Sequence, residues 1–116
     1  MIERLENIAK AKEFINLVFD TVCAGEYGQS YNIVNDNIAV LNQVLTSLLN
    51  DLPFIQSLGI EFPKDIVLGQ MNHFMEALEH HDSVLLIDSL VYELGDSIAF
   101  YEEIIYEMQK NNICFG

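Results

Sequence analysis

The stretch from Tyr27 to Leu52 reads YGQSYNIVNDNIAVLNQVLTSLLNDL, and its apolar residues decide the fold. They recur at alternating spacings of four and three residues, a series that a helix produces and that strand alternation cannot. The positions are Tyr27, Tyr31, Val34, Ile38, Leu41, Leu45, Leu48 and Leu52. The pattern predicts one long helix whose continuous apolar stripe faces a core.

A complementary stripe occupies the last third of the sequence and predicts a second long helix. Its positions are Val84, Ile87, Val91, Leu94, Ile98, Tyr101, Ile105 and Met108. Two shorter periodic segments predict a helix from Ile8 to Val22 and another from Val67 to Leu78, with Pro63 in the first turn of the latter. The sequence therefore predicts four helices and an all-α fold.

Turn signals divide these helices into two hairpins. We expect a turn at Gly25 to Gly28, and a second one at His80 to Ser83 in which Asp82 or Ser83 caps the next helix. The segment between Pro53 and Pro63 should connect the hairpins. We thus predict one helical domain over 1–116, with hairpin 1 at about 3–52, the connection at 53–62 and hairpin 2 at about 63–110. An antiparallel four-helix bundle is the simplest arrangement, and an open, tetratricopeptide-like pair of hairpins is the alternative.

Charge is the most unusual feature of the composition. The chain has 18 acidic and 5 basic residues, which gives a formal net charge of -13. Phosphate binding needs clustered lysine and arginine, so nucleic acid and acidic membrane surfaces are disfavoured as partners. A negative field instead attracts cationic partners.

The remaining compositional signals concern the compartment. Cys23 and Cys114 are the only cysteines, and no secretory signal opens the sequence, so we expect free thiols in a reducing environment. The apolar runs are shorter than the roughly 20 residues that a bilayer span requires. The sequence predicts a cytoplasmic protein without a membrane partner.

His73, Glu76 and His80 form the best candidate for a metal site. On a helix they share one face, because they are three, four and seven residues apart. Imidazole and carboxylate ligands suit zinc, nickel or iron. The same face points away from the Val67 to Leu78 stripe, so the alternative interpretation is a solvated helix face that happens to contain histidines.

Other catalytic chemistry has little support in the sequence. A di-iron bundle needs glutamate followed three residues later by histidine on two helices, and that spacing does not occur here. A glycine-rich phosphate loop, a zincin motif and a nucleophile elbow are also missing from the sequence. We therefore expect neither an enzyme nor a bound cofactor.

One segment resembles a known group of proteins. The run from Ala77 to Leu94, ALEHHDSVLLIDSLVYEL, is similar to part of small uncharacterised helical proteins that accompany motility and surface-glycosylation genes in bacteria. The resemblance implies a bacterial cytosolic accessory protein, and it brings no functional residues with it.

These observations together predict a non-catalytic protein-interaction module. Apolar residues outnumber the stripe positions, and the surplus could form a contact surface for a partner protein. We expect an adaptor or chaperone-like accessory protein, forming a homodimer and binding a protein partner that is basic in character. The alternative is a metal-binding helical protein that uses His73, Glu76 and His80.

Overall fold

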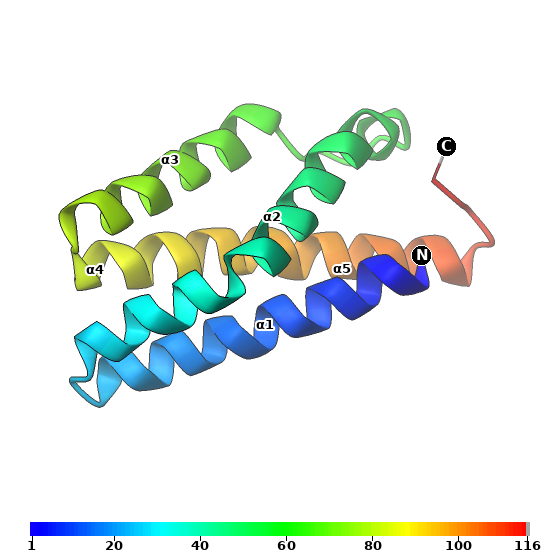
Figure 1. Cartoon of the computed structure of the whole chain (residues 1–116). Coiled ribbons are helices and arrows are strands. Elements are labelled where there is room, and N and C mark those ends of the chain that lie inside the picture. Colours follow the sequence, from blue (N-terminus) through cyan, green and yellow to red (C-terminus); the bar gives the residue numbers. More distant parts are fainter. Residues whose placement is uncertain (116) are drawn as a thin grey trace.

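The computed structural model describes residues 1–115, and every regular element in them is helical (Figure 1). This confirms the all-α prediction. The elements are α1 (Ile2–Cys23), α2 (Tyr27–Ser57), α3 (Lys64–His80), α4 (Ser83–Leu86), the π-helix η1 (Ile87–Leu94) and α5 (Gly95–Lys110).

The last three elements follow one another without a break and form one long central helix. α1 and α2 pack against each other as the first hairpin, and α1 also contacts η1 and α5. α3 packs mainly on α4 and η1, and it contacts α2 at only a few positions. The molecule is elongated, with extents of 44 × 25 × 19 Å. The two hairpins are therefore joined chiefly through the central helix.

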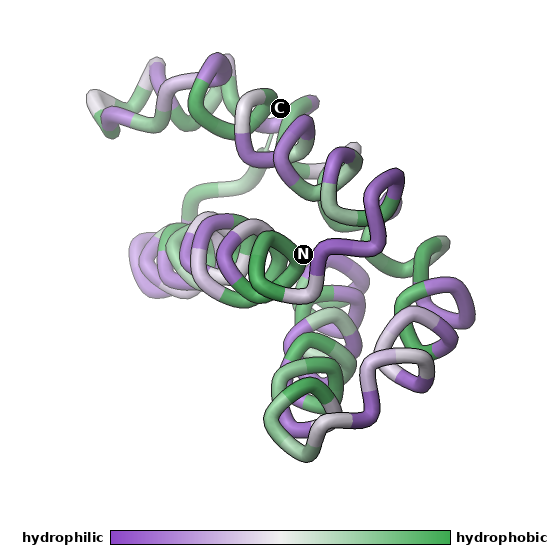
Figure 2. The backbone as a smooth tube through the Cα atoms, turned by 90° about the vertical axis from the view of Figure 1, so that its left-hand side faces the viewer, coloured by the Kyte–Doolittle hydropathy of each residue, from purple (hydrophilic) through white to green (hydrophobic). Residues whose placement is uncertain are grey.

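Amphipathic helices account for this arrangement. Figure 2, turned by 90° from Figure 1, shows hydrophobic positions on each helix interrupted by hydrophilic ones. Buried side chains from α1, α2, α3 and the central helix belong to one cluster. In α2 the predicted stripe is buried at Val34 and from Leu41 to Leu52, whereas Tyr27 at its start is exposed.

The predicted connection at 53–62 begins too early. α2 continues through Pro53 to Ser57, so that the connection starts at Leu58. Proline removes one backbone hydrogen bond from a helix and usually bends or ends it. Here Leu52 and Ile55 on either side of Pro53 are almost completely buried, and their packing holds the last turns in place.

The predicted stripe of the final helix is wrong at its beginning. Val84 is 73% exposed, whereas Leu86 and Leu90 are completely buried. The buried residues Leu86, Leu90, Leu94 and Ile98 are each four positions apart, a spacing that drifts by about 40° per step on an α-helix of 3.6 residues per turn. The wider turns of η1, with hydrogen bonds from i to i+5, reduce that drift. From Leu94 to Met108 the predicted stripe is buried as expected.

α2 also has the length and composition of a membrane-spanning helix. Its most apolar window of 18 residues has a mean hydropathy of 1.3, and 39% of that window is buried in the fold. The core helix of a soluble protein meets the same criterion, so this composition does not distinguish the two cases. The cytoplasmic location stays a prediction.

Candidate functional site

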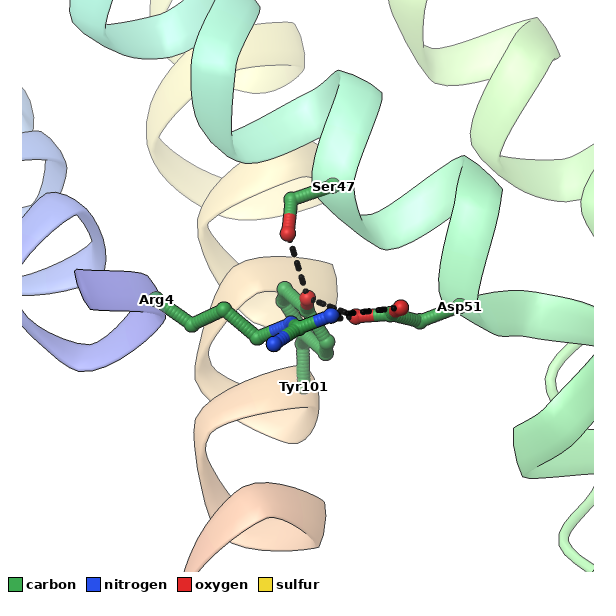
Figure 3. Close-up of polar contacts among 4 residues, drawn as sticks. All are labelled: Arg4, Ser47, Asp51 and Tyr101. Carbon is green, nitrogen blue, oxygen red and sulfur yellow. Dashed lines mark hydrogen bonds and ion pairs between the residues drawn. The ribbon is translucent and has the colours of Figure 1, made fainter. Parts of the chain in front are cut away.

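Four polar side chains from three helices meet in a network at one end of the hairpin formed by α1 and α2 (Figure 3). Asp51 of α2 is only 7% exposed, and its carboxylate accepts hydrogen bonds from Arg4 Nε at 2.8 Å and Nη2 at 3.1 Å. The hydroxyl of Tyr101, a completely buried residue of α5, donates to Asp51 Oδ2 at 2.5 Å. Ser47 Oγ lies 2.9 Å from that hydroxyl. The network thus joins α1, α2 and α5.

The directions of these hydrogen bonds follow from the number of protons available. The Tyr101 hydroxyl has one proton, which it donates to Asp51, so Ser47 must be the donor in the other hydrogen bond. Burial, together with the hydrogen bond to Asp51, raises the pKa of Tyr101 and keeps its phenol neutral. The hydrogen bond to Asp51 likewise raises the pKa of Arg4. These groups are suited to holding helices together rather than to exchanging protons near neutral pH.

The segment after α5 covers this network. Asn112 adopts a left-handed conformation (φ 56°), and the Ile113 N–H donates to the Met108 carbonyl at 2.8 Å, which turns the chain back. The ring of Phe115 then lies 4.5 Å from the Arg4 guanidinium and 5.7 Å from the Phe54 ring. A cation over an aromatic ring is an attractive arrangement.

An open groove runs beside the network between α1 and α2, with a volume of about 540 Å³. We call it the amide groove, because its walls contain four carboxamide side chains. Besides Arg4 and Ser47 its lining includes Glu3, Asn7, Asn42, Gln43, Thr46 and Asn50.

A second pocket lies at the opposite end, where the turns of the two hairpins meet (left in Figure 1). We call it the tip pocket; its volume is about 490 Å³. It is lined by Val22, Tyr27, His81, Asp82, Ser83, Val84, Ile87 and Asp88. Asp82 caps α4 as predicted, since its carboxylate accepts a hydrogen bond from the Leu85 N–H at 3.0 Å.

Tyr31 lies beside two residues of the tip pocket, His81 and Ser83. Its ring lies 5.0 Å from that of His81, which holds a left-handed conformation (φ 50°) at the end of α3. The Tyr31 hydroxyl is buried and makes no hydrogen bond of normal geometry within residues 1–115, although Ser83 is beside it. Burial is the main reason that the pKa of Tyr31 is raised.

The three predicted metal ligands lie on the exposed face of α3, as the stripe implied. His73 Nδ1 is paired with Glu93 Oε1 of η1 at 2.8 Å, and this hydrogen bond raises the pKa of His73. Within the described chain, groups of three or more histidine, cysteine and acidic side chains placed to hold a metal ion are not found. The geometry does not favour a site at His73, Glu76 and His80, and that site stays a prediction.

No sequence pattern predicted that Arg4, Ser47, Asp51 and Tyr101 would meet. The periodic pattern placed Tyr101 in the core stripe of the final helix and gave Asp51, which lies in hairpin 1, no role. A usable signal existed, because Asp51 lies three residues after Leu48 and directly before Leu52, on the side of α2 that faces the core. A carboxylate there needs a partner, and the chain contains only five basic residues to supply one.

Comparisons with known proteins give neither a family nor a function for this chain. No protein-family model, no curated protein and no solved structure matches the chain. The resemblance of residues 77–94 to bacterial accessory proteins therefore stays a prediction.

Proposed function

We propose that this chain is a non-catalytic protein-interaction module, an adaptor or chaperone-like accessory protein, that docks a basic and partly apolar segment of another protein in the tip pocket. The observation that carries the proposal is the exposure of Val84 (73%) and Tyr27 (54%) on the walls of one pocket with two aspartates. Recognition would take place where the turns of the two hairpins meet.

The apolar part of the pocket supplies the contact area. Val84 and Tyr27 are largely exposed, and Val22 and Ile87 in the same lining are partly buried. Covering apolar surface yields roughly 25 cal/mol per Å², and aromatic residues contribute more than their share at interfaces. A large apolar side chain of a partner would therefore be favoured in this pocket.

Charge favours a basic partner. Asp82 and Asp88 are exposed members of the lining, and the whole chain has a net charge of -13. Such a field raises the rate of encounter with cationic segments and is screened by salt beyond a Debye length of about 8 Å at physiological ionic strength.

The network of Arg4, Ser47, Asp51 and Tyr101 supports a scaffold role in this proposal. Its carboxylate is paired with a guanidinium, and its phenol is held neutral by a raised pKa. The network connects α1, α2 and α5, and α1 leads directly to the turn at one side of the tip pocket. A rigid support lowers the cost of ordering an interface on binding.

A peptide titration tests the proposal. The probe is a helical peptide with leucine on one face and lysine on the other. Its counterpart has glutamate in place of lysine. We expect the lysine peptide to shift the amide NMR signals of residues 22–27 and 81–88, with an affinity that falls as salt is raised. The glutamate peptide should shift none of them.

Variants locate the binding surface. Replacing Tyr27 and Val84 with serine should weaken binding of the lysine peptide by about tenfold, since about 1.4 kcal/mol of contact energy corresponds to that factor. The matched control replaces Tyr92 and Ile66, which are 55% and 56% exposed but lie outside the pocket. Equal losses in both double variants would contradict the tip pocket as the docking site. Formation of a homodimer stays a prediction, which light scattering after size exclusion measures directly.

A further inference from the structure

The polar groove between α1 and α2 differs in character from the rest of this acidic molecule. From Asn37 to Asn50, α2 has no charged residue, although 20% of the chain is charged. The charged groups of the groove lining are Glu3, Arg4 and the terminal amino group of Met1, and Arg4 is already paired with Asp51. The site therefore presents hydrogen-bonding groups with little net charge.

The carboxamides of the groove are free to bind a ligand. Arg4 and Ser47 are engaged in the network, but within residues 1–115 the side chains of Asn7, Asn42 and Asn50 make no hydrogen bond. Each carboxamide offers both a donor and an acceptor, as does the hydroxyl of Thr46. A ligand that alternates donors and acceptors would satisfy all of them.

The spacing along α2 matches one such ligand. Asn42, Thr46 and Asn50 are four residues apart, so successive side chains lie about 6 Å apart along the helix and are turned by about 40° around it. In an extended polypeptide, residues that point the same way are about 6.6–6.8 Å apart. Over two intervals the mismatch is about 1.5 Å, which rotation of the side chains can absorb. Each of these side chains can then meet the N–H and C=O groups of alternate residues.

Other ligands fit the groove less well. Anionic ligands such as nucleic acids need several clustered unpaired cations, whereas this lining offers the Met1 amino group beside Glu3, which would repel them. Single-stranded bases also need aromatic platforms, whereas aromatic side chains do not occur in this lining. A main chain is neutral, and its backbone groups require hydrogen-bond partners when they leave water.

We propose that the amide groove binds an extended segment of a partner polypeptide through its main chain, with a lysine or arginine of that segment beside Glu3. Since Arg4 pairs with Asp51, its neighbour Glu3 lies at the Asn50 end of the groove, and this sets the position of the basic residue. The site is separate from the tip pocket and does not depend on the function proposed there.

The test uses an unstructured eight-residue peptide of alternating alanine and serine with one terminal lysine. Amide NMR signals of the full chain should shift for groove residues of α1 and α2 and saturate with peptide concentration. The same peptide methylated on every amide nitrogen cannot donate main-chain hydrogen bonds, and it should bind at least tenfold more weakly. Equal binding of both peptides, or no shifts in the groove, would overturn the proposal.

Matched variants on the same helix localise the contact. Asn42→Ala with Asn50→Ala should weaken the peptide by about tenfold or more, because each lost hydrogen bond is worth a factor of roughly five. Asn32→Ala with Asn35→Ala removes two exposed carboxamides outside the groove and should leave the affinity within twofold. If the groove variant binds as well as the wild type, the proposal is wrong. The circular dichroism of both variants checks that the helices are intact.

Discussion

α3 and the hairpin of α1 and α2 both pack on the central helix, but they are attached to it in different ways. α2 buries side chains along most of its length, from Ser30 to Ile55. α3 buries only Val67, Phe74 and Ala77 in 17 residues. Burial of apolar area is the main stabilising term, so α3 is the more weakly held of the two.

The ion pairs of the two regions also indicate that α3 is held more weakly. Asp51 in the network is shielded from water, whereas the His73–Glu93 pair that links α3 to η1 is exposed, with 51% of the His73 side chain accessible. Exposed ion pairs stabilise a fold by about 0–1 kcal/mol, but loss of one partner from a buried pair costs several. We therefore expect α3 to open before the rest of the molecule, as a local unit of low stability.

Core truncations in the two regions give the largest expected effects. Leu94→Ala in the central helix should lower the free energy of unfolding by about 2–5 kcal/mol, since Leu94 is completely buried. Phe74→Ala removes a larger side chain but should lower it by less, because α3 can detach before the core unfolds. Urea denaturation of both variants, followed by circular dichroism, measures the difference. A Phe74→Ala loss as large as that of Leu94→Ala would show that α3 belongs to the same cooperative unit.

Substitution in the network ranks second. Asp51→Asn keeps the shape but leaves the Arg4 charge unpaired, and we expect a loss of about 2–3 kcal/mol of stability, reduced from the fully buried case because Arg4 is 30% exposed. Arg4→Met combined with Asp51→Asn should recover part of that loss. Chemical denaturation of both single variants and the double variant gives the coupling energy. Additive losses would mean that Arg4 and Asp51 do not act as a pair.

Substitution of two glycines inside helices should have smaller effects on stability. A Cβ at Gly69 of α3 would meet no atom within 4 Å, so Gly69→Ala should stabilise α3 by about 0.5–1 kcal/mol through helix propensity alone. A Cβ at Gly95 would contact the Leu90 carbonyl oxygen at 3.4 Å, and the gain there should be smaller. Hydrogen exchange of α3 amides should slow in Gly69→Ala and stay unchanged in Gly95→Ala.

The smallest expected effect is a pH dependence confined to α3. The hydrogen bond to Glu93 raises the pKa of His73 above its unfolded value near 6.5. The stabilisation from this pair is therefore complete below that unfolded pKa, and it is lost as the pH rises through the folded pKa. Amide exchange in α3, corrected for the intrinsic pH effect, should therefore speed up above neutral pH. Glu93→Gln should abolish the change, and His80→Gln should preserve it. A pH response of the same size in Glu93→Gln would exclude this pair as its cause.

The fold was predictable wherever helix periodicity and burial agree. From Leu41 to Leu52 and from Leu94 to Met108, each predicted position faces the core. The prediction failed at Val84 because it assumed 3.6 residues per turn, whereas η1 turns more widely. It failed at Pro53 because packing of Ile55 outweighed the local cost of proline in a helix.

The candidate sites were less predictable than the fold. The network joins Arg4, Asp51 and Tyr101 from three helices, and no short motif connects residues about 50 positions apart. The tip pocket depends on both turns reaching the same end of the molecule, which the hairpin prediction implied but did not specify in detail. Exposure of Val84 could not be anticipated, because the periodic pattern placed it in the core.

The network of Arg4, Asp51 and Tyr101 joins parts of the chain that the ribosome synthesises at different times. Asp51 follows Arg4 by 47 residues, and Tyr101 follows Asp51 by 50. At a synthesis rate of about 5–20 residues per second, the first hairpin leaves the ribosome several seconds before the tyrosine that completes its polar contacts. During that interval the apolar seam of α2 lacks its cover from α5, so a nascent chain stalled before residue 101 should be a substrate for chaperones.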